Sequence, residues 1–574
     1  MKHGGEVVAS TLMQHNIKYI FTLCGGHISP ILVACKQNNI KVIDVRHEVT
    51  AVFAADAISR LSPAIGVAAV TAGPGLTNTL TAVKNLQMAQ VPVLLICGAT
   101  ATILKNRGSL QDIDQIGMMK SLTKYQAVIK KGKHISDELN KAIIIAQSDV
   151  PGPVFIEFPL DVLYPKDMVY DLYGLNKITR KTSWFEKQYL QINFNRIFND
   201  FNKKPLPVPK ITYSKISSNK LLNCLDLIVK ARRPLLLIGS QAMLDILNIK
   251  KISKQLSSID IPIFTSGMAR GLLSNEEIKI FRHKRTQALN ESDLVILAGV
   301  PCDFRLGYGK QINRNAKIIA INRSRKDLYL NIKPTLAIQS DPGDSIFKIS
   351  EKLSKKKLDM SIWLDNLRTR ENKRENQIEE QSNLKTDYVN PMKLFKTVNN
   401  HIEKNDIIVA DGGDFVATAS YILQPRFHLG WLDPGPFGTL GVGAGFILGS
   451  KLAYPDSIIW GIYGDGAFGY SMIEFDTFYR HKIPLIAIIG NDGGWTQIAR
   501  DQIEIFKDPV ATELGYTNYH EVIDKLGGVG YEITENDEVN NVIIEAKENA
   551  KLGKSVLINV KIGKTDFRKG SISV

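Results

Sequence analysis

The chain alternates short, nearly continuous apolar runs with longer stretches of mixed polarity. Strands that are buried on both faces of a parallel sheet give such continuous runs, and the helices between them are amphipathic. Gly-rich turns follow several of the runs, where functional loops lie in open α/β sheets. In the first block the runs are 18–23, 41–45, 65–72, 92–98 and 153–159.

Runs of the same kind return in two further blocks. They are 232–242, 261–267, 292–300 and 317–323, and then 406–413, 457–466, 483–492 and 555–563. A chain of 574 residues is too long for one hydrophobic core. We predict an α/β fold of three parallel-sheet domains joined by two connectors, the second of them charged and helical. The domains are 1–165, 221–350 and 388–574, and the connectors are 166–220 and 351–387.

Two segments in different blocks resemble each other. QVPVLLICG (90–98) and KIPLIAIIG (482–490) each place a proline before an apolar run that ends in glycine. This pair indicates that the first and third blocks share a topology.

Composition narrows the class of protein. Lys and Arg total 72 against 57 Asp and Glu, a net charge of +15, which is compatible with anionic ligands but is better explained by a general compositional bias, since Asn and Ile are abundant as well. The charge is spread along the chain without an arginine-rich arm, so we expect no nucleic-acid partner. Five scattered cysteines form neither a disulfide framework nor a zinc site, and no apolar run reaches the length of a membrane span.

The strongest chemical signal lies in the third block. One apolar run leads directly into Gly464-Asp465-Gly466, and the next ends in Asn491-Asp492. A Gly-Asp-Gly turn exposes backbone N–H groups to a phosphate and places a carboxylate beside it. Mg²⁺ prefers oxygen ligands that include phosphate oxygens. The spacing predicts a magnesium and phosphate site at two adjacent strand ends.

With these motifs the chain resembles, over nearly its whole length, the acetolactate synthase and 2-hydroxyacyl-CoA lyase superfamily of thiamine-diphosphate enzymes. The resemblance implies a pyrimidine-binding domain, a central nucleotide-binding-like domain and a diphosphate-binding domain, with thiamine diphosphate and Mg²⁺ as cofactors. The matching segments are GGHISP (25–30), RHEVTAVFAADA (46–57), TAGPGLTN (71–78), NRGSLQDIDQ (106–115), DGGDF (411–415), LDPGPFGTLGVGAGFILG (432–449), GDGAFGYSMIEFDTF (464–478) and GNDGGWTQ (490–497).

The resemblance also assigns the residues that would activate the cofactor and hold its metal. It implies that Glu48 hydrogen-bonds N1′ of the aminopyrimidine and so promotes loss of the C2 proton of the thiazolium. It implies that Mg²⁺ is held by Asp465, Asp492 and the backbone carbonyl of Gly494. Many members carry Asn at the position of Asp492, and a carboxylate is also a good Mg²⁺ ligand.

Further positions are carried over for the body of the cofactor and for the substrate. Leu440 would separate the two rings, and the Gly438 carbonyl would accept from N4′. The residues expected near the aminopyrimidine are Pro74 and Gly75, and those expected around the diphosphate are Gly413, Asp414, Gly464, Gly466 and Ala467. The candidates for contact with substrate are His27, Gln111, Phe415 and Trp495, of which we expect His27 and Gln111 to be catalytic.

Three activities stay open, and the lyase is favoured. A 2-hydroxyacyl-CoA lyase, as in fatty acid α-oxidation, yields formyl-CoA and an aldehyde one carbon shorter. An acetolactate synthase joins 2-keto acids, but Pro301 stands where synthases bind the second keto acid with arginine, and Asp501 stands where they carry tryptophan. A non-catalytic regulatory paralogue would not need Glu48, Asp465 and Asp492.

The remaining expectations concern the central domain, assembly and location. Relatives bind FAD or ADP in the central domain or leave it empty, and without an intact phosphate fingerprint here we do not favour either ligand. The resemblance implies a homodimer or homotetramer with active sites shared between subunits, acting on an acyl-CoA or 2-keto acid. It also implies the endoplasmic reticulum, although no membrane anchor is present in this chain; the alternative is the cytoplasm.

Overall fold

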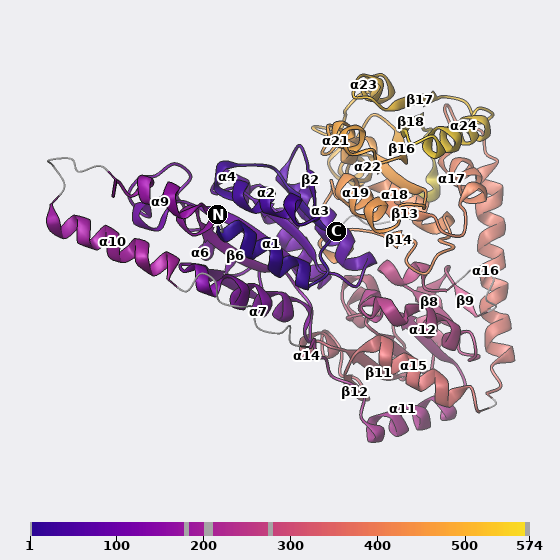
Figure 1. The fold of residues 1–574 in the computed structure, drawn as a ribbon. Coiled ribbons are helices and arrows are strands. Elements are labelled where there is room, and N and C mark those ends of the chain that lie inside the picture. Colours follow the sequence, from indigo (N-terminus) through magenta and orange to yellow (C-terminus); the bar gives the residue numbers. More distant parts are fainter. Residues whose placement is uncertain (1–2, 177–182, 200–209, 274–278, 357, 569–574) are drawn as a thin grey trace. The chain divides into compact units, whose positions relative to one another are not determined.

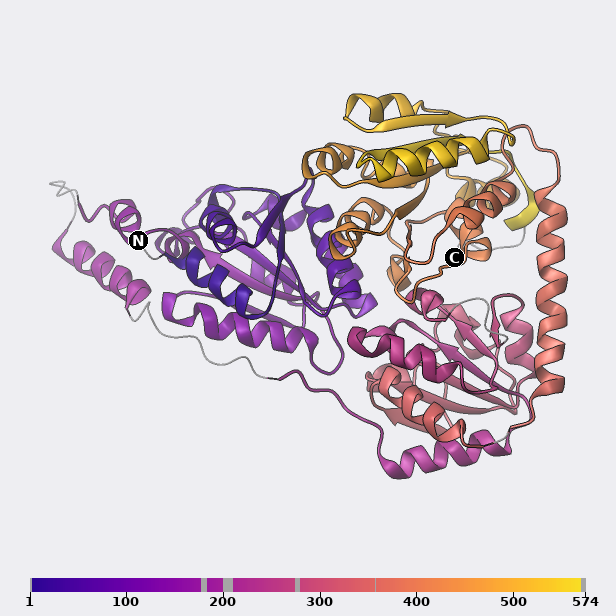
Figure 2. The same cartoon turned by 45° about the vertical axis from the view of Figure 1, so that its right-hand side comes forward.

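A computed structural model describes residues 3–176, 183–199, 210–273, 279–356 and 358–568. The chain divides into two compact units, Met1–Thr212 and Tyr213–Val574. The first unit contains one six-stranded parallel sheet and the second contains two (Figures 1 and 2). The α/β class and the three parallel sheets that the apolar runs predict are confirmed.

The sheet of the first unit has the order β2-β1-β3-β4-β6-β5. Helices α1 (Gly4–Gln14), α2 (Ser29–Gln37) and α7 (Ile135–Gln147) share one hydrophobic core with it. Helices α3 (Glu48–Leu61) and α5 (Leu80–Ala89) pack together, and α3 also packs on β1, β3 and β4. The strands are β1 (Tyr19–Thr22), β2 (Lys41–Asp44), β3 (Gly66–Val70), β4 (Val93–Ala99), β5 (Tyr125–Val128) and β6 (Val154–Pro159).

The first sheet of the second unit has the order β12-β11-β10-β7-β8-β9. Numbered from its own first strand, this is the 3-2-1-4-5-6 order of dinucleotide-binding folds. Helices α11 (Ser218–Lys230), α12 (Ile249–Leu256) and α15 (Pro342–Leu353) pack together beside it. The strands are β7 (Pro234–Ile238), β8 (Ile263–Thr265), β9 (Ile280–Phe281), β10 (Leu294–Ala298), β11 (Lys317–Asn322) and β12 (Leu336–Gln339).

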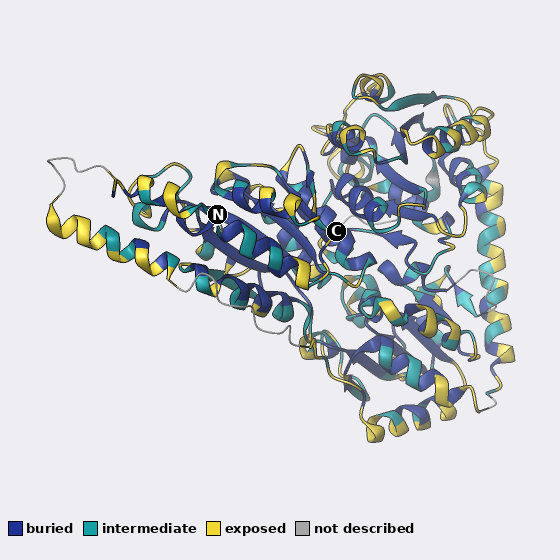
Figure 3. Ribbon diagram, viewed as in Figure 1, coloured by how far each residue is buried: buried dark blue, intermediate teal, exposed yellow. Residues whose placement is uncertain are grey.

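The last sheet repeats the connectivity of the first, with the order β14-β13-β15-β16-β18-β17. The resembling segments 90–98 and 482–490 contain β4 and β16, each the fourth strand of its sheet, so the prediction of a shared topology is confirmed. In both units the central strands are buried, and exposed residues lie on the outer helices (Figure 3). The strands are β13 (Ile407–Ala410), β14 (Trp431–Leu432), β15 (Ile459–Gly464), β16 (Leu485–Asn491), β17 (Val529–Ile533) and β18 (Ser555–Lys561).

The two segments that we predict as connectors contain helices. Within 166–220 lie α9 (Lys166–Leu172) and α10 (Trp184–Phe198), and α10 buries Phe194 and Ile197 in the core of the first unit. Within 351–387 lies α16 (Ser361–Ser382), a straight helix of 22 residues along one side of the second unit (Figures 1 and 2). In the described part of the chain, no helix combines the length and apolar character needed to cross a bilayer.

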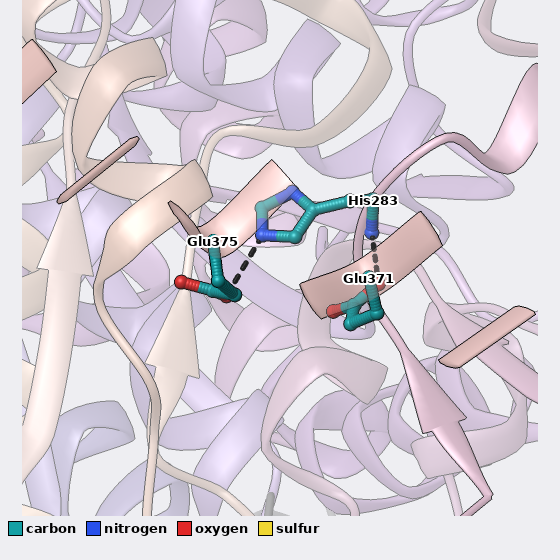
Figure 4. Close-up of side chains that lie close together, drawn as sticks. All are labelled: His283, Glu371 and Glu375. Atoms are coloured by element: carbon teal, nitrogen blue, oxygen red, sulfur yellow. Dashed lines mark hydrogen bonds and ion pairs between the residues drawn. The ribbon is translucent and has the colours of Figure 1, made fainter. Parts of the chain in front are cut away.

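Helix α16 is fixed to the segment after β9 by a charged group (Figure 4). His283 Nε2 lies 2.9 Å from Glu375 Oε1, and the backbone N–H of His283 donates to Glu371 at 3.0 Å. The ligand-type atoms of the three residues lie within 4.8 Å of one another. Arg282 also pairs with both carboxylates, so their charge is already compensated. We interpret the group as a structural clamp.

Candidate active site

The acidic candidate residues of the second unit lie at the carboxyl ends of β15 and β16. Asp465 opens the short helix α20 (Asp465–Phe468) directly after β15, and its side chain is almost fully buried. Its carboxylate accepts the backbone N–H of Gly466 at 2.9 Å and of Gly494 at 3.1 Å. Asp492 follows β16 directly. The two strands pair in parallel and are adjacent, so both carboxylates emerge at one edge of the sheet.

These two carboxylates are in electrostatic conflict, which a cation would remove. Burial, and after it the charge of Asp492, raises the pKa of Asp465 to about 7. Burial also raises the pKa of Asp492. Oxygen ligands of this kind suit Mg²⁺, and a bound cation would favour the ionised form of both carboxylates. The residues present therefore fit the predicted metal.

The glycine-rich turns after β13 and β15 form an open surface suited to phosphate. Gly413 precedes α18 (Asp414–Ile422) with φ of +103°, and a Cβ there would meet nothing within 4 Å. Gly464 is almost as open, since its nearest neighbour would be Gly412 O at 3.8 Å. The Asp414 carboxylate accepts from Arg500 Nη2 at 2.5 Å. Of the predicted diphosphate residues, the backbone at Gly413 and Gly464 is the part left accessible.

Asp411 fixes the loop that is expected to bend the cofactor. Its buried carboxylate accepts the N–H groups of Gly441 at 2.9 Å and Gly443 at 2.7 Å, and burial raises its pKa to about 7. This bond pair holds Leu440 against Gly412, where a Cβ would lie 2.4 Å from Leu440 Cδ2. Gly438 has φ of +65° and open space around its Cα. Asp411 is a functional candidate that we do not single out from sequence.

The two aromatic candidates, Phe415 and Trp495, lie in different surroundings. Phe415 packs on Phe395, with ring centroids 4.5 Å apart, and against Gly490. It belongs to the hydrophobic core of this domain, and its contact with substrate stays a prediction. Trp495 packs on Gly466, where a Cβ would lie 2.5 Å from its ring, and it thus covers the turn that contains Asp465.

A second group of predicted site residues lies in the first unit, at the carboxyl ends of its strands. Glu48 is the first residue of α3 and is only 6% exposed. Its Oε2 accepts from Asn78 Nδ2 at 3.0 Å. A Cβ on Gly75 would lie 3.7 Å from Glu48 Oε1, so the turn that contains Pro74 and Gly75 lies beside the carboxylate. The structure thus brings Glu48 together with the predicted pyrimidine segment, and it adds Asn78.

His27 follows β1 and points its imidazole toward the turn after β3. His27 Nδ1 lies 3.0 Å from Thr71 Oγ1. Burial lowers the pKa of His27, so the imidazole is neutral at pH 7. Among the described residues Nε2 has no hydrogen-bond partner, which leaves that nitrogen for a ligand. Thr71 is a second residue that we do not single out from sequence.

Gly98→Ala is expected to lower kcat/KM by about tenfold or more, because a small displacement of a catalytic group is costly. The new Cβ would lie 2.3 Å from His27 Cβ, so the histidine has to move. Gly152→Ala is the matched control in the same unit, since its Cβ would meet only the flexible Lys124 stem, at 3.1 Å. Steady-state kinetics on both variants measure the effect, and equal values would contradict a catalytic role for His27.

Gln111 lies in a loop that packs against the turn after β3. It has φ of +64°, is half-buried and presses on Gly73, where a Cβ would lie 2.9 Å from Gln111 Cβ. It also lines a cavity of about 230 Å³. The other polar residues around this cavity are Thr100, Thr102, Lys105, Asp112, Gln115, Lys130 and Glu157.

Comparison with known proteins assigns both groups of residues to domains of one class of enzyme. Three family models of thiamine pyrophosphate enzymes match the chain: the N-terminal TPP binding domain over residues 2–118, the central domain over 221–349 and the C-terminal TPP binding domain over 411–560. The fold and these two groups of residues together define a thiamine-pyrophosphate enzyme.

Full-length relatives narrow the class. The chain is 48% identical to 2-hydroxyacyl-CoA lyase 2 of Danio rerio, over 100% of this chain and 94% of that protein. It is 45% identical to 2-hydroxyacyl-CoA lyase 2 of Homo sapiens, over 100% and 92%. Identity to the acetolactate synthase large subunit of Mycobacterium tuberculosis is 29%, over 92% and 90%. The chain belongs to the 2-hydroxyacyl-CoA lyase 2 family.

Proposed function

We propose that this protein is a lyase dependent on thiamine diphosphate and Mg²⁺ that cleaves the C1–C2 bond of a 2-hydroxyacyl-CoA, a reaction of fatty acid α-oxidation. The products are an aldehyde one carbon shorter and formyl-CoA. The observation that carries the proposal is that a chain of this family holds both a buried, hydrogen-bonded Glu48 and two neighbouring carboxylates that repel each other, the buried Asp465 and the half-buried Asp492.

Different residues of the chain would bind different parts of the cofactor. Asp465 and Asp492 would hold Mg²⁺ through their carboxylates, with the Gly494 carbonyl as a third ligand. The turns at Gly413 and Gly464 would face the diphosphate. Thiamine diphosphate, when bound, supplies the carbon nucleophile that this class of reaction needs. Leu440, held in place through Asp411, would separate the two rings of the cofactor.

Proton transfer would be shared by Glu48 and His27. Glu48 would hold or move the proton at N1′ of the aminopyrimidine, with Asn78 orienting its carboxylate at 3.0 Å. His27 Nε2 would accept the proton of the substrate 2-hydroxyl, since its Nδ1 is engaged with Thr71. The hydroxyl proton leaves oxygen as the C1–C2 bond breaks, and C1 gains a proton to become formyl-CoA, so the atoms balance.

Assembly follows from the same proposal. Glu48 belongs to the first unit and Asp465 to the second, and one cofactor needs both. We propose a homodimer or homotetramer in which neighbouring subunits contribute one half each. The resemblance to the lyase family extends the proposal to a location at the endoplasmic reticulum.

To test the proposal, purified protein is loaded with thiamine diphosphate and Mg²⁺. It is then incubated in parallel with a long-chain 2-hydroxyacyl-CoA or with pyruvate. Mass spectrometry follows the products. We expect the shortened aldehyde from the acyl-CoA and no acetolactate from pyruvate. Acetolactate without aldehyde would replace the lyase by a synthase, and cofactor binding without either product would overturn both.

A further inference from the structure

Gln115 is a buried amide that ties the loop containing Gln111 to the ends of three strands. It is the first residue of α6 (Gln115–Met119) and is 2% exposed. Its Oε1 accepts the N–H of Gly73 at 3.0 Å and lies 3.3 Å from Cys97 Sγ. Its Nε2 donates to Gly98 O at 3.1 Å and to Glu157 at 3.0 Å. These four contacts use the whole hydrogen-bonding capacity of a glutamine amide.

Glu157 completes the arrangement from β6. Its carboxylate is 1% exposed, accepts from Gln115 through Oε2 and pairs with Lys105 Nζ at 3.3 Å through Oε1. A charged group at this depth is costly unless it is hydrogen-bonded. The ion pair and the amide supply that compensation, so Glu157 in turn fixes the orientation of the Gln115 amide.

The backbone groups that Gln115 holds lie next to each predicted catalytic residue. Gly73 presses on Gln111 and begins the turn whose Gly75 lies beside Glu48. Gly98 lies so close to His27 that a Cβ added to Gly98 would clash with the histidine. One side chain therefore sets the spacing between the backbone segments behind three groups that must act on one substrate.

We propose that Gln115, oriented by Glu157, is a positioning residue of the lyase reaction; the inference rests on the function proposed above. It holds the turn after β3, the end of β4 and the Gln111 loop in one fixed arrangement. Loss of that arrangement lowers kcat more than it changes KM, because the groups that misalign act on the reacting atoms.

The test is Gln115→Glu, which keeps the shape of the side chain. It replaces the Nε2 amide group, which donates to Gly98 O and Glu157, by an oxygen that can only accept. We expect kcat to fall by on the order of 10²-fold, while KM and the dissociation constant of thiamine diphosphate stay within about threefold. Adding Glu157→Gln places a donor opposite the new carboxylate and should recover about tenfold of kcat. The matched control is Asn140→Asp, another buried amide of the first unit, which bonds His15 at 2.7 Å.

A second readout uses the protein without cofactor. In hydrogen-exchange mass spectrometry, Gln115→Glu should speed exchange in residues 71–78 and 106–115, the double variant should restore it, and Asn140→Asp should not affect it. Should Gln115→Glu not fold, Gln115→Asn, whose amide is too short to reach Glu157, takes its place. Unchanged kcat and exchange, or equal losses in the control, would overturn the proposal. If the unsubstituted protein lacks lyase activity, the proposed function fails, and the exchange data still decide the structural part.

Discussion

Glu48→Gln is expected to reduce turnover by about 10³-fold while thiamine diphosphate and Mg²⁺ still bind. The amide keeps the shape of the side chain and can still accept from Asn78, whose Nδ2 lies 3.0 Å from Glu48 Oε2. It cannot exchange a proton with the aminopyrimidine. Steady-state kinetics give the loss in kcat, and calorimetric titration of the cofactor shows that the site is intact.

A glutamate in a similar local position provides the control. Glu6 lies in the first turn of α1, as Glu48 does in α3, but it faces outward with a side chain 33% exposed. Glu6→Gln should leave both kcat and cofactor binding within about twofold, as is usual for exposed positions. Wild-type turnover in Glu48→Gln would remove Glu48 from the mechanism.

The two candidate metal ligands are expected to differ in their response to amide substitution. Asp465→Asn should weaken Mg²⁺-dependent cofactor binding by about 10²-fold, and Asp492→Asn by no more than about tenfold. Both oxygens of Asp465 accept backbone N–H groups, from Gly466 and Gly494, so an amide NH₂ in either place sets donor against donor. Asn at position 492 still offers an oxygen ligand.

Calorimetric titration of Mg²⁺ in the presence of thiamine diphosphate measures this difference. The same titration on the unsubstituted protein should depend on pH. The pKa of Asp465 is raised to about 7, so below pH 7 the metal must displace a proton from this carboxylate. Mg²⁺ affinity should therefore rise as pH increases toward 7 and level off above it. Equal losses in the two variants would contradict the predicted difference, and unchanged Mg²⁺ affinity in Asp465→Asn would contradict its assignment as a ligand.

The buried strands could be predicted from sequence, whereas most edge strands could not, β2 being the exception. Central strands such as β4 and β16 are buried along their whole length and give continuous apolar runs. The strands without a predicted counterpart all lie at sheet edges, where β5 and β17 are only half-buried and β9 and β14 are two residues long. An edge strand has one neighbour and needs no apolar run.

For the candidate site as well, only part could be predicted from sequence. Glu48 lies shortly after β2, and Asp465 and Asp492 directly follow β15 and β16, so sequence places each of them near the carboxyl end of a strand. Gln115 belongs to a quoted motif as well, but its role depends on Glu157, which is 42 residues away. Contacts of this kind, like those between Asp411 and the Gly441 loop, arise from tertiary packing.

The most direct measurement traces the C1 carbon of the proposed substrate. Purified protein with thiamine diphosphate and Mg²⁺ is incubated with a long-chain 2-hydroxyacyl-CoA labelled with ¹³C at C1, and the products are identified by mass spectrometry. A C1–C2 lyase places the label in formyl-CoA, or in formate after hydrolysis, and leaves the shortened aldehyde unlabelled. Label that stays in intact acyl-CoA while pyruvate is converted to acetolactate would contradict the proposed function.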